Sequence, residues 1–149
     1  MKLALMLHLL GAVVWIGGMF FAYLALRPAA AELLLPPQRL PLWSATLGRF
    51  FRWVWVSIAL LLGSGFYMFS VIANAGQVPL YVHAMLYIGV VMSLIFACVF
   101  FSPFPTLQRA VASQDWQQAG VALNQIRMAM AVNLGLGLAN IVVATAGAI

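Results

Sequence analysis

The side chains of this sequence that are best suited to chemistry are its two histidines, His8 and His83. Each interrupts a long apolar run, the first of which reads ALMLHLLGAVVWIGGMFF. Imidazole is a good ligand for iron, copper and zinc, and an ionisable group inside an apolar segment usually marks a site. The two histidines are therefore the candidate metal ligands of the chain.

The residues around the histidines form apolar stretches long enough to cross a membrane. Of the 149 residues, 66% are hydrophobic and only 6% are charged, which is too apolar for a water-soluble domain of this size. A helix needs about 20 apolar residues to cross the hydrocarbon of a bilayer. The sequence therefore predicts one all-α transmembrane domain over residues 1–149, an up-down four-helix bundle with spans at 3–26, 53–73, 80–101 and 128–149.

The arginines are divided unevenly among the segments that connect these spans. Residues 27–52 contain four arginines and residues 102–127 contain two, whereas residues 74–79 contain none. Segments rich in Lys and Arg stay in the cytoplasm. The pattern predicts a multi-pass protein of a bacterial-type inner (plasma) membrane, with cytoplasmic loops at 27–52 and 102–127 and both termini outside. Only Lys2 argues the other way.

Prolines and one aspartate give the expected ends of helices in these connecting segments. Pro36 and Pro37 are expected to break the chain, after which QRLPLWSATLGRFFRW forms an interfacial helix leading into the second span. Pro103 and Pro105 are expected to end the third span. Asp115 is placed to cap a helix that begins at Trp116 and runs into the fourth span.

The two histidines are expected at similar depths in the bundle. Both lie near the outer ends of their spans, and their depths differ by about 3 Å at 1.5 Å per residue. If the first and third spans are diagonal neighbours roughly 13 Å apart, two imidazoles can reach one iron atom from opposite sides. Haem b with His8 and His83 as axial ligands fits this arrangement.

The residues that share a helix face with His8 are small or aromatic. Gly11 and Ala12 leave space next to the imidazole, and Trp15 places an indole on the same face. Such a slot suits a flat ligand, although close packing of two helices would also use small residues.

Polar residues in the other spans are further candidates for contact with a bound cofactor. Tyr87 lies one helical turn from His83, and Asn140 shares a face of the fourth span with Asn133. Interhelical hydrogen bonds would explain the asparagines without any ligand. No residue is predicted to be catalytic.

Copper is the alternative ligand for the same histidines. Cu(I) favours thioether and imidazole ligands, and Met68 and Met85 lie toward the outer side. Methionine is also an ordinary packing residue in helices. The single cysteine, Cys98, excludes a multi-thiolate zinc or iron-sulfur site. A structural subunit without any ligand is a further option.

The first span, LHLLGAVVWIGGMFFAYLALRPA, resembles the copper-resistance D (CopD)-like integral membrane proteins, whose pattern is a histidine, six residues, then Trp-x-Gly-Gly. His8, Trp15, Gly17 and Gly18 match this pattern. The segment PLYVHAMLYIGVVMSLIFACVFFSPFPTLQRAV is similar to the same group at His83, and the resemblance continues through DWQQAGVALNQIRMAMAVNLGLGLANI. The resemblance implies a role in copper handling.

The same superfamily looks related to the HemJ-type protoporphyrinogen oxidases, which contain haem and share the His-x6-Trp spacing. Those oxidases have a lysine two residues after the histidine of the third segment, where this chain has Met85. Porphyrinogen oxidation is therefore a third reading, and whether the protein is an oxidoreductase stays open.

Together, these patterns favour a membrane-embedded haem b protein with bis-histidine ligation and a role in electron transfer. The partners that such a role implies are the lipid bilayer and a quinone or another redox carrier, and no nucleic acid is expected. A homodimer would rearrange which histidines face each other. Copper binding or copper transport through the same histidines is the alternative function.

Overall fold

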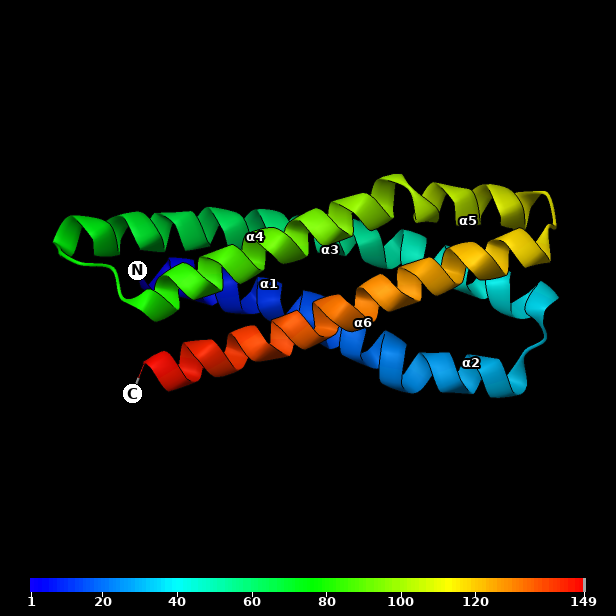
Figure 1. Cartoon of the computed structure of the whole chain (residues 1–149), viewed down its shortest axis with the longest axis horizontal. Helices are drawn as coiled ribbons and strands as arrows, with labels where there is room; N and C mark the ends of the chain where they lie inside the picture. Colours follow the sequence, from blue (N-terminus) through cyan, green and yellow to red (C-terminus); the bar gives the residue numbers. More distant parts are fainter. Residues whose placement is uncertain (149) are drawn as a thin grey trace.

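The computed structural model describes residues 1–148 as long helices packed side by side (Figure 1). No strand occurs in this part of the chain, which confirms the all-α prediction. The elements in chain order are α1 (Lys2–Phe21), the π-helix η1 (Ala22–Leu26), α2 (Arg27–Leu33), α3 (Pro36–Ala75), α4 (Leu80–Phe101), α5 (Pro103–Ala112) and α6 (Trp116–Gly147).

These elements form four long helical segments, each apolar enough over 18 residues to cross a membrane. The segments are Lys2–Leu33, Pro36–Ala75, Leu80–Ala112 and Trp116–Gly147. They contain the four predicted spans, except that the fourth helix ends at Gly147 and the predicted span at 149. Residue 149 lies outside the described residues. The prediction of a multi-pass membrane protein is therefore confirmed.

The two arginine-bearing segments differ from the expected loops, because most of residues 27–52 and 102–127 are helical. The expected interfacial helix and the second span form one continuous helix, α3, of 40 residues. At 1.5 Å per residue it is about 60 Å long, roughly twice the hydrocarbon thickness. Helix persists beyond the span because these segments bury apolar side chains of their own, including Leu40, Leu47, Leu107 and Ile126.

The helix ends predicted in these two arginine-bearing segments are confirmed. Leu34 adopts an extended backbone and α3 begins at Pro36, as the paired prolines indicated. Helix α4 ends at Phe101 and α5 begins at Pro103. The Asp115 side chain accepts a hydrogen bond of 3.1 Å from the backbone N–H of Gln118, so it caps α6 as expected.

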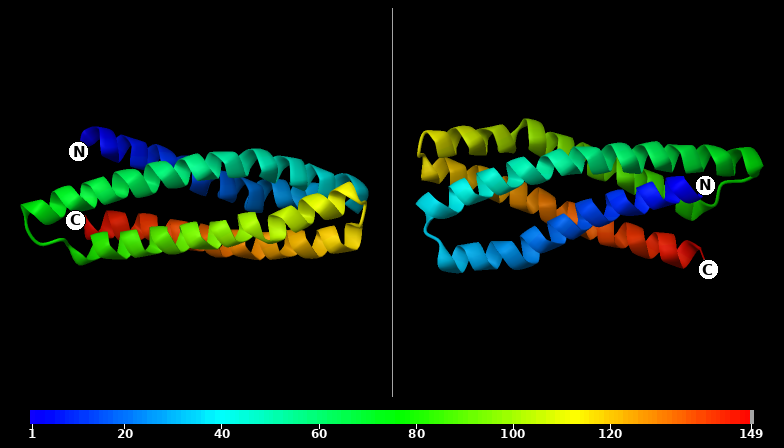
Figure 2. Two further views of the ribbon diagram at one scale, coloured as in Figure 1. Left: turned by 90° about the horizontal axis from the view of Figure 1, so that it is seen from above. Right: turned by 180° about the vertical axis from the view of Figure 1, so that it is seen from behind.

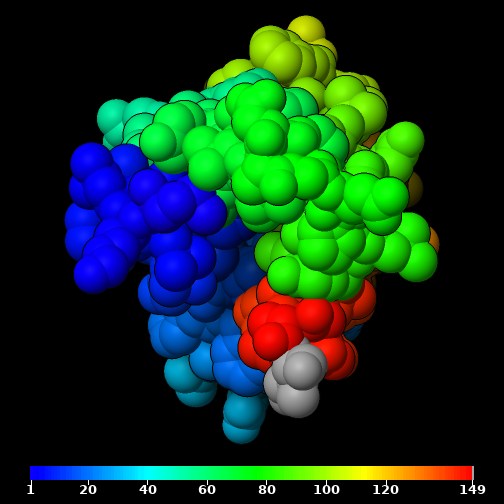
Figure 3. Space-filling view, turned by 90° about the vertical axis from the view of Figure 1, so that its left-hand side faces the viewer, coloured from blue at the N-terminus to red at the C-terminus, as the bar shows by residue number. Residues whose placement is uncertain are grey.

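The helical segments run up and down, so each end of the bundle has its own set of connections. Both chain ends and the α3–α4 connection lie at one end, here called the terminal end (Figures 1 and 3). The opposite end contains α2, α5 and the start of α6, and is here called the arginine end (Figure 1). Figure 2 shows the same separation from two further sides.

The bundle consists of two closely packed helix pairs. Helix α1 packs mainly on α3, and α4 packs mainly on α6, while contacts between the two pairs are sparser. Helix α1 also touches α6, and α4 also touches α3, so α1 and α4 occupy opposite corners of the bundle. This matches the diagonal arrangement assumed for the first and third spans.

An aromatic core fills the middle of the bundle. The Phe51 ring meets Phe96 edge-on at 5.1 Å and Phe104 edge-on at 4.9 Å between centroids. Trp15 extends this core, because its ring lies edge-on to Phe96 at 6.2 Å and only 3% of its surface is exposed. The core joins the two helix pairs and separates the terminal end from the arginine end.

Candidate functional site

The ring of His8 is held by a hydrogen bond across the α1–α3 pair. Its Nδ1 atom lies 2.9 Å from the hydroxyl oxygen of Ser64. That hydroxyl donates its single proton to the backbone carbonyl of Leu60, so its oxygen must accept from the Nδ1–H of His8. In a neutral imidazole this leaves the lone pair on Nε2, which is the atom that can bind a metal.

The ring of His83 is held in the same tautomer by its own helix. Its Nδ1 atom lies 3.2 Å from the backbone carbonyl oxygen of Pro79. A carbonyl oxygen can only accept, so Nδ1 carries the proton and Nε2 is again the free nitrogen. Phe69 of α3 packs edge-on against this ring, with 5.3 Å between centroids.

Helix α3 lies beside both imidazoles in its C-terminal half, which is the half nearer the terminal end of the bundle. Ser64 is hydrogen-bonded to His8, a β-carbon added at Gly65 would lie 3.4 Å from the same ring, and Phe69 packs against His83. These α3 positions are separated by a rise of about 7 Å. The two histidines therefore lie in the terminal half of the bundle on opposite corners, and α3 lies beside both.

The small residues next to His8 pack against α3. A methyl group added at Gly11 would lie 3.1 Å from the backbone oxygen of Ser57 and 3.1 Å from Leu61. Trp15 belongs to the aromatic core, and Ala12 is half-buried. The contacts of Gly11 are those of close helix packing, and the role of these three residues in binding a flat ligand stays a prediction.

The asparagines of α6 form the expected interhelical hydrogen bonds. Asn133 donates to the backbone oxygen of Met92 at 3.1 Å, and Asn140 donates to that of Met85 at 3.5 Å. The side-chain oxygen of each asparagine is buried and has no partner in the structure. Asn140 therefore brings an unsatisfied acceptor to the helix turn of α4 that contains His83.

The remaining predicted residues lie at the edge of this region or outside it. Tyr87 is 73% exposed, so its ring lies on the outer surface of the bundle. Met68 and Met85 are half-buried. Cys98 is exposed. The contact of Tyr87 with a ligand stays a prediction, and the exposure of its ring does not support it.

Sequence reasoning did not identify Ser64 as the partner of His8, or Phe69 as the neighbour of His83. The signal for Ser64 was present, because it shares a helix face with Ser57 and Met68 in the sequence. Which of these polar faces meets α1 depends on the rotation of α3 within the bundle, which the sequence pattern leaves open.

The donor set of this region limits the metals that it suits. Among residues 1–148 no group of three or more His, Cys, Asp or Glu side chains gathers closely enough to hold a metal ion. A metal here would depend on the two imidazoles and on softer or neutral donors such as thioethers. That set suits copper(I) better than the hard cations calcium and magnesium, which need several oxygen ligands.

Comparisons with known proteins identify one family. The profile of copper resistance protein D matches residues 44–147, which run from α3 to the end of α6 and include Ser64, His83 and Asn140 but not His8. A search of curated proteins finds no significant match, and neither does a search of solved structures. Because the matched region covers more than half of the sequence, this membrane protein belongs to the copper resistance protein D family.

Proposed function

We propose that this protein binds copper in the terminal half of its bundle and handles the ion at the membrane, with Nε2 of His8 as a primary ligand. The observation that carries the proposal is the chain of hydrogen bonds from His8 through Ser64 to the backbone of Leu60. Metal-binding histidines commonly donate their second ring N–H to such a partner, which fixes the ring and keeps the ligating nitrogen unprotonated.

Further ligands are available from the neighbouring helices. His83 offers Nε2 in the same tautomer. Met68 lies one helical turn after Ser64 on α3, which places its thioether on the face that meets His8. Imidazole and thioether are the donors that Cu(I) favours. Asn140 adds a buried, unpartnered oxygen near His83.

The residues between this site and the arginine end oppose free passage of an ion. Trp15, Phe51 and Phe96 close the middle of the bundle with buried rings. Beside these rings the structure places one buried amide, Asn133, and its single unpartnered oxygen is too little to replace the water shell of a hydrated ion. We therefore propose that copper is held in the conformation described here, and that its transfer across the membrane requires the two helix pairs to separate.

The arginine distribution supports one orientation of the site in the membrane. We propose that the arginine end faces the cytoplasm and that both termini lie outside, in a bacterial-type inner membrane. The copper ligands would then face the outer side, where the ion could enter between the helix ends of the terminal end.

Cu(I) binding by the detergent-purified protein tests this proposal. Competition with a chromophoric Cu(I) chelator gives the affinity of the wild type and of His8→Ala, His83→Ala and Met68→Leu. Met128→Leu is the matched control for the methionine, because Met128 is 64% exposed on α6. We expect His8→Ala to cause the largest loss, and no change in Met128→Leu. Equal affinity in the wild type and in a His8→Ala/His83→Ala double variant would disprove the proposed ligands.

Haem b is the second candidate, and one observation favours it. Helices α1 and α4 occupy opposite corners of the bundle, and both histidines have Nε2 free for axial coordination. The packing argues against it, because Gly11, one turn after His8 on α1, lies tightly against α3 and leaves no slot beside the imidazole there. A porphyrin would fit only if the helix pairs moved apart.

An absorption spectrum of protein expressed with both haem and copper supplied separates the two candidates. Bis-histidine haem b would give a low-spin Soret spectrum and weak carbon monoxide binding, lost or changed to high spin in His8→Ala and His83→Ala. Copper binding without a Soret band would support the first proposal. Complementation of cells lacking porphyrinogen oxidation would instead support the HemJ-like reading despite Met85.

A further inference from the structure

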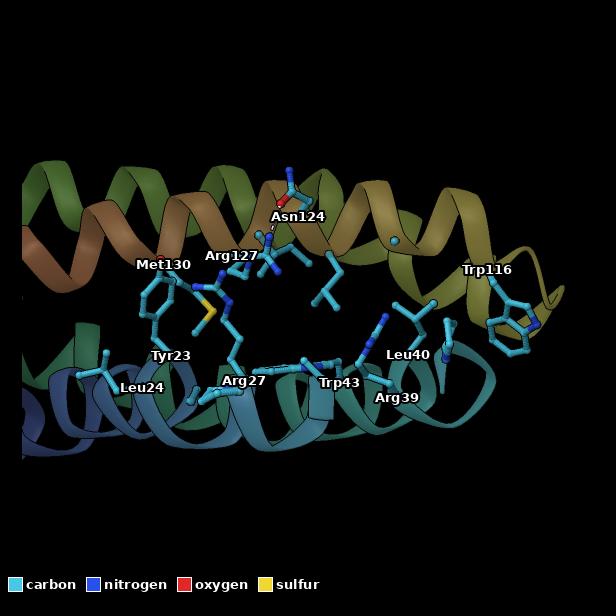
Figure 4. Close-up of a pocket in the computed structure, with 17 residues that line it drawn as sticks. Tyr23, Leu24, Arg27, Arg39, Leu40, Trp43, Trp116, Asn124, Arg127 and Met130 are labelled. Carbon is cyan, nitrogen blue, oxygen red and sulfur yellow. Dashed lines mark hydrogen bonds between the residues drawn. The ribbon is translucent and has the colours of Figure 1, made fainter. Parts of the chain in front are cut away.

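A groove of about 650 Å³ opens at the arginine end, on the far side of the aromatic core from the histidines (Figure 4). Its walls come from η1 and α2, from the start of α3 and from the first half of α6. Arg27, Arg39 and Arg127 line the groove, and none of its described lining residues is acidic. The copper proposal makes no use of this groove.

These three arginines differ from the others in the same half of the molecule. Arg27, Arg39 and Arg127 are half-buried, whereas Arg49, Arg52 and Arg109 are exposed. Removing cations from water is costly unless an opposite charge or suitable acceptors are supplied. Three half-buried guanidinium groups around one groove would therefore be stabilised by an anion bound between them.

The partners that the arginines have within the protein are neutral. Arg27 lies over the ring of Tyr23 at 4.8 Å, and Arg127 donates to the side-chain oxygen of Asn124 at 2.7 Å. These contacts orient the guanidinium groups without cancelling their charge. Figure 4 shows Arg27 reaching across the groove toward Arg127 on α6, while Arg39 extends into the groove from α3.

The π-helix η1 places the first of these arginines. Pro28 has no N–H and therefore cannot donate to the carbonyl of Leu24, as the α-helical pattern would require. One residue earlier, the N–H of Arg27 bonds to the carbonyl of Ala22, five residues back, which is the π-helical pattern. The extra residue in this turn changes the direction of the side chains that follow it, and such π-helical turns often occur at functional sites. Ala22, Tyr23 and Arg27 all line the groove.

The rest of the groove is apolar and aromatic. Leu24 and Met130 line it near the membrane-spanning half, Leu40 lines it near the start of α3, and Trp43 and Trp116 provide indole rings (Figure 4). Tryptophan is enriched at the level of lipid headgroups. A ligand that fits this groove has a negative headgroup and an apolar tail, rather than being a small inorganic anion.

We propose that the groove binds the phosphate headgroup of an anionic phospholipid, with Arg27, Arg39 and Arg127 as phosphate ligands. Guanidinium groups match phosphate oxygens with paired hydrogen bonds, and basic pockets between membrane helices on the cytoplasmic side suit such headgroups. The bound lipid would bridge the first helical segment to α6, which the structure otherwise joins by few contacts at this end.

Lipid-dependent stability of the purified, delipidated full-length protein tests the proposal. The probes are phosphatidylglycerol, phosphatidylcholine and inorganic phosphate, each added to the protein in the same detergent, with the melting temperature and lipid retention by native mass spectrometry as readouts. The site variant is Arg27→Gln/Arg39→Gln/Arg127→Gln. The control, Arg49→Gln/Arg52→Gln/Arg109→Gln, removes the same charge from exposed positions.

We expect phosphatidylglycerol to raise the melting temperature of the wild type and the control, and to bind the site variant at least about tenfold more weakly. Phosphatidylcholine and inorganic phosphate should produce no comparable shift. An equal response of both triple variants would overturn the site, and an equal effect of phosphatidylcholine would overturn the need for an anionic headgroup. Stabilisation by inorganic phosphate alone would overturn the lipid assignment. If the site variant does not fold, the same melting temperatures and lipid retention are compared between the single variants Arg39→Gln and Arg49→Gln, and the same outcomes decide.

Discussion

The Nδ1 atom of His8 lies 2.9 Å from the hydroxyl of Ser64, across 56 positions of sequence and between two helices of the bundle. Because the Ser64 hydroxyl donates to its own helix, the contact fixes both the position of the imidazole and its tautomer. A side chain that sequence reasoning identified by its type is thus given a defined chemical state by a neighbour on α3.

Removal of the Ser64 hydroxyl should weaken copper binding while leaving the ligands in place. Loss of a partner that orients a metal-binding histidine typically lowers metal affinity by about 10- to 100-fold, which we expect for Ser64→Ala. Ser70→Ala is the control, because the Ser70 hydroxyl bonds within its own helix to Tyr67 at 2.8 Å. Ser64→Thr should retain much of the affinity. Equal affinities for the two alanine variants would show that Ser64 does not position His8.

A larger side chain at Gly11 should separate α1 from α3. A β-carbon there already meets the backbone of Ser57 at 3.1 Å, and backbone cannot give way as a flexible side chain can. We expect Gly11→Val to destabilise the protein by about 1–3 kcal/mol, seen as a lower melting temperature in detergent. Gly17→Val on the same helix has open space around it and should be nearly neutral. Similar melting temperatures for the two variants would contradict this packing.

Single cysteines introduced at opposite ends of the bundle should report the orientation. In a protein with Cys98→Ala, we expect Gln77→Cys to react with a membrane-impermeant maleimide on intact cells, because it lies in the uncharged α3–α4 connection. Gln38→Cys, at the arginine end, should react only after the membrane is permeabilised. Labelling of Gln38→Cys alone on intact cells would reverse the orientation and place the histidines toward the cytoplasm.

Loss of the Asp115 cap should loosen the first turn of α6. The carboxylate accepts from the N–H of Gln118, and removal of such a cap typically costs about 1 kcal/mol. Asp115→Ala should therefore show faster hydrogen exchange in this turn, while Asp115→Asn, which can still accept, should stay close to the wild type. Unchanged exchange in Asp115→Ala would mean that packing of α6 alone holds the turn.

The sequence by itself determined the elements of this protein and their ends. Long runs without charge require helices in lipid, since every backbone polar group must be satisfied within its own segment. The prolines at positions 36 and 103 and the aspartate at 115 act locally, so their effects on the helix ends followed from residue type alone. The rarity of ionisable groups in such segments also singled out His8 and His83.

Only the tertiary structure decided which side chains meet. The rotation of each helix about its axis and the pairing of α1 with α3 depend on the packing of many small contacts, which no single segment encodes. For this reason the sequence did not show that Gly11 packs against α3, or that Tyr87 lies on the outer surface of the bundle. The same packing brings Ser64 to His8 and gathers Arg27, Arg39 and Arg127, which are far apart in sequence, around one groove.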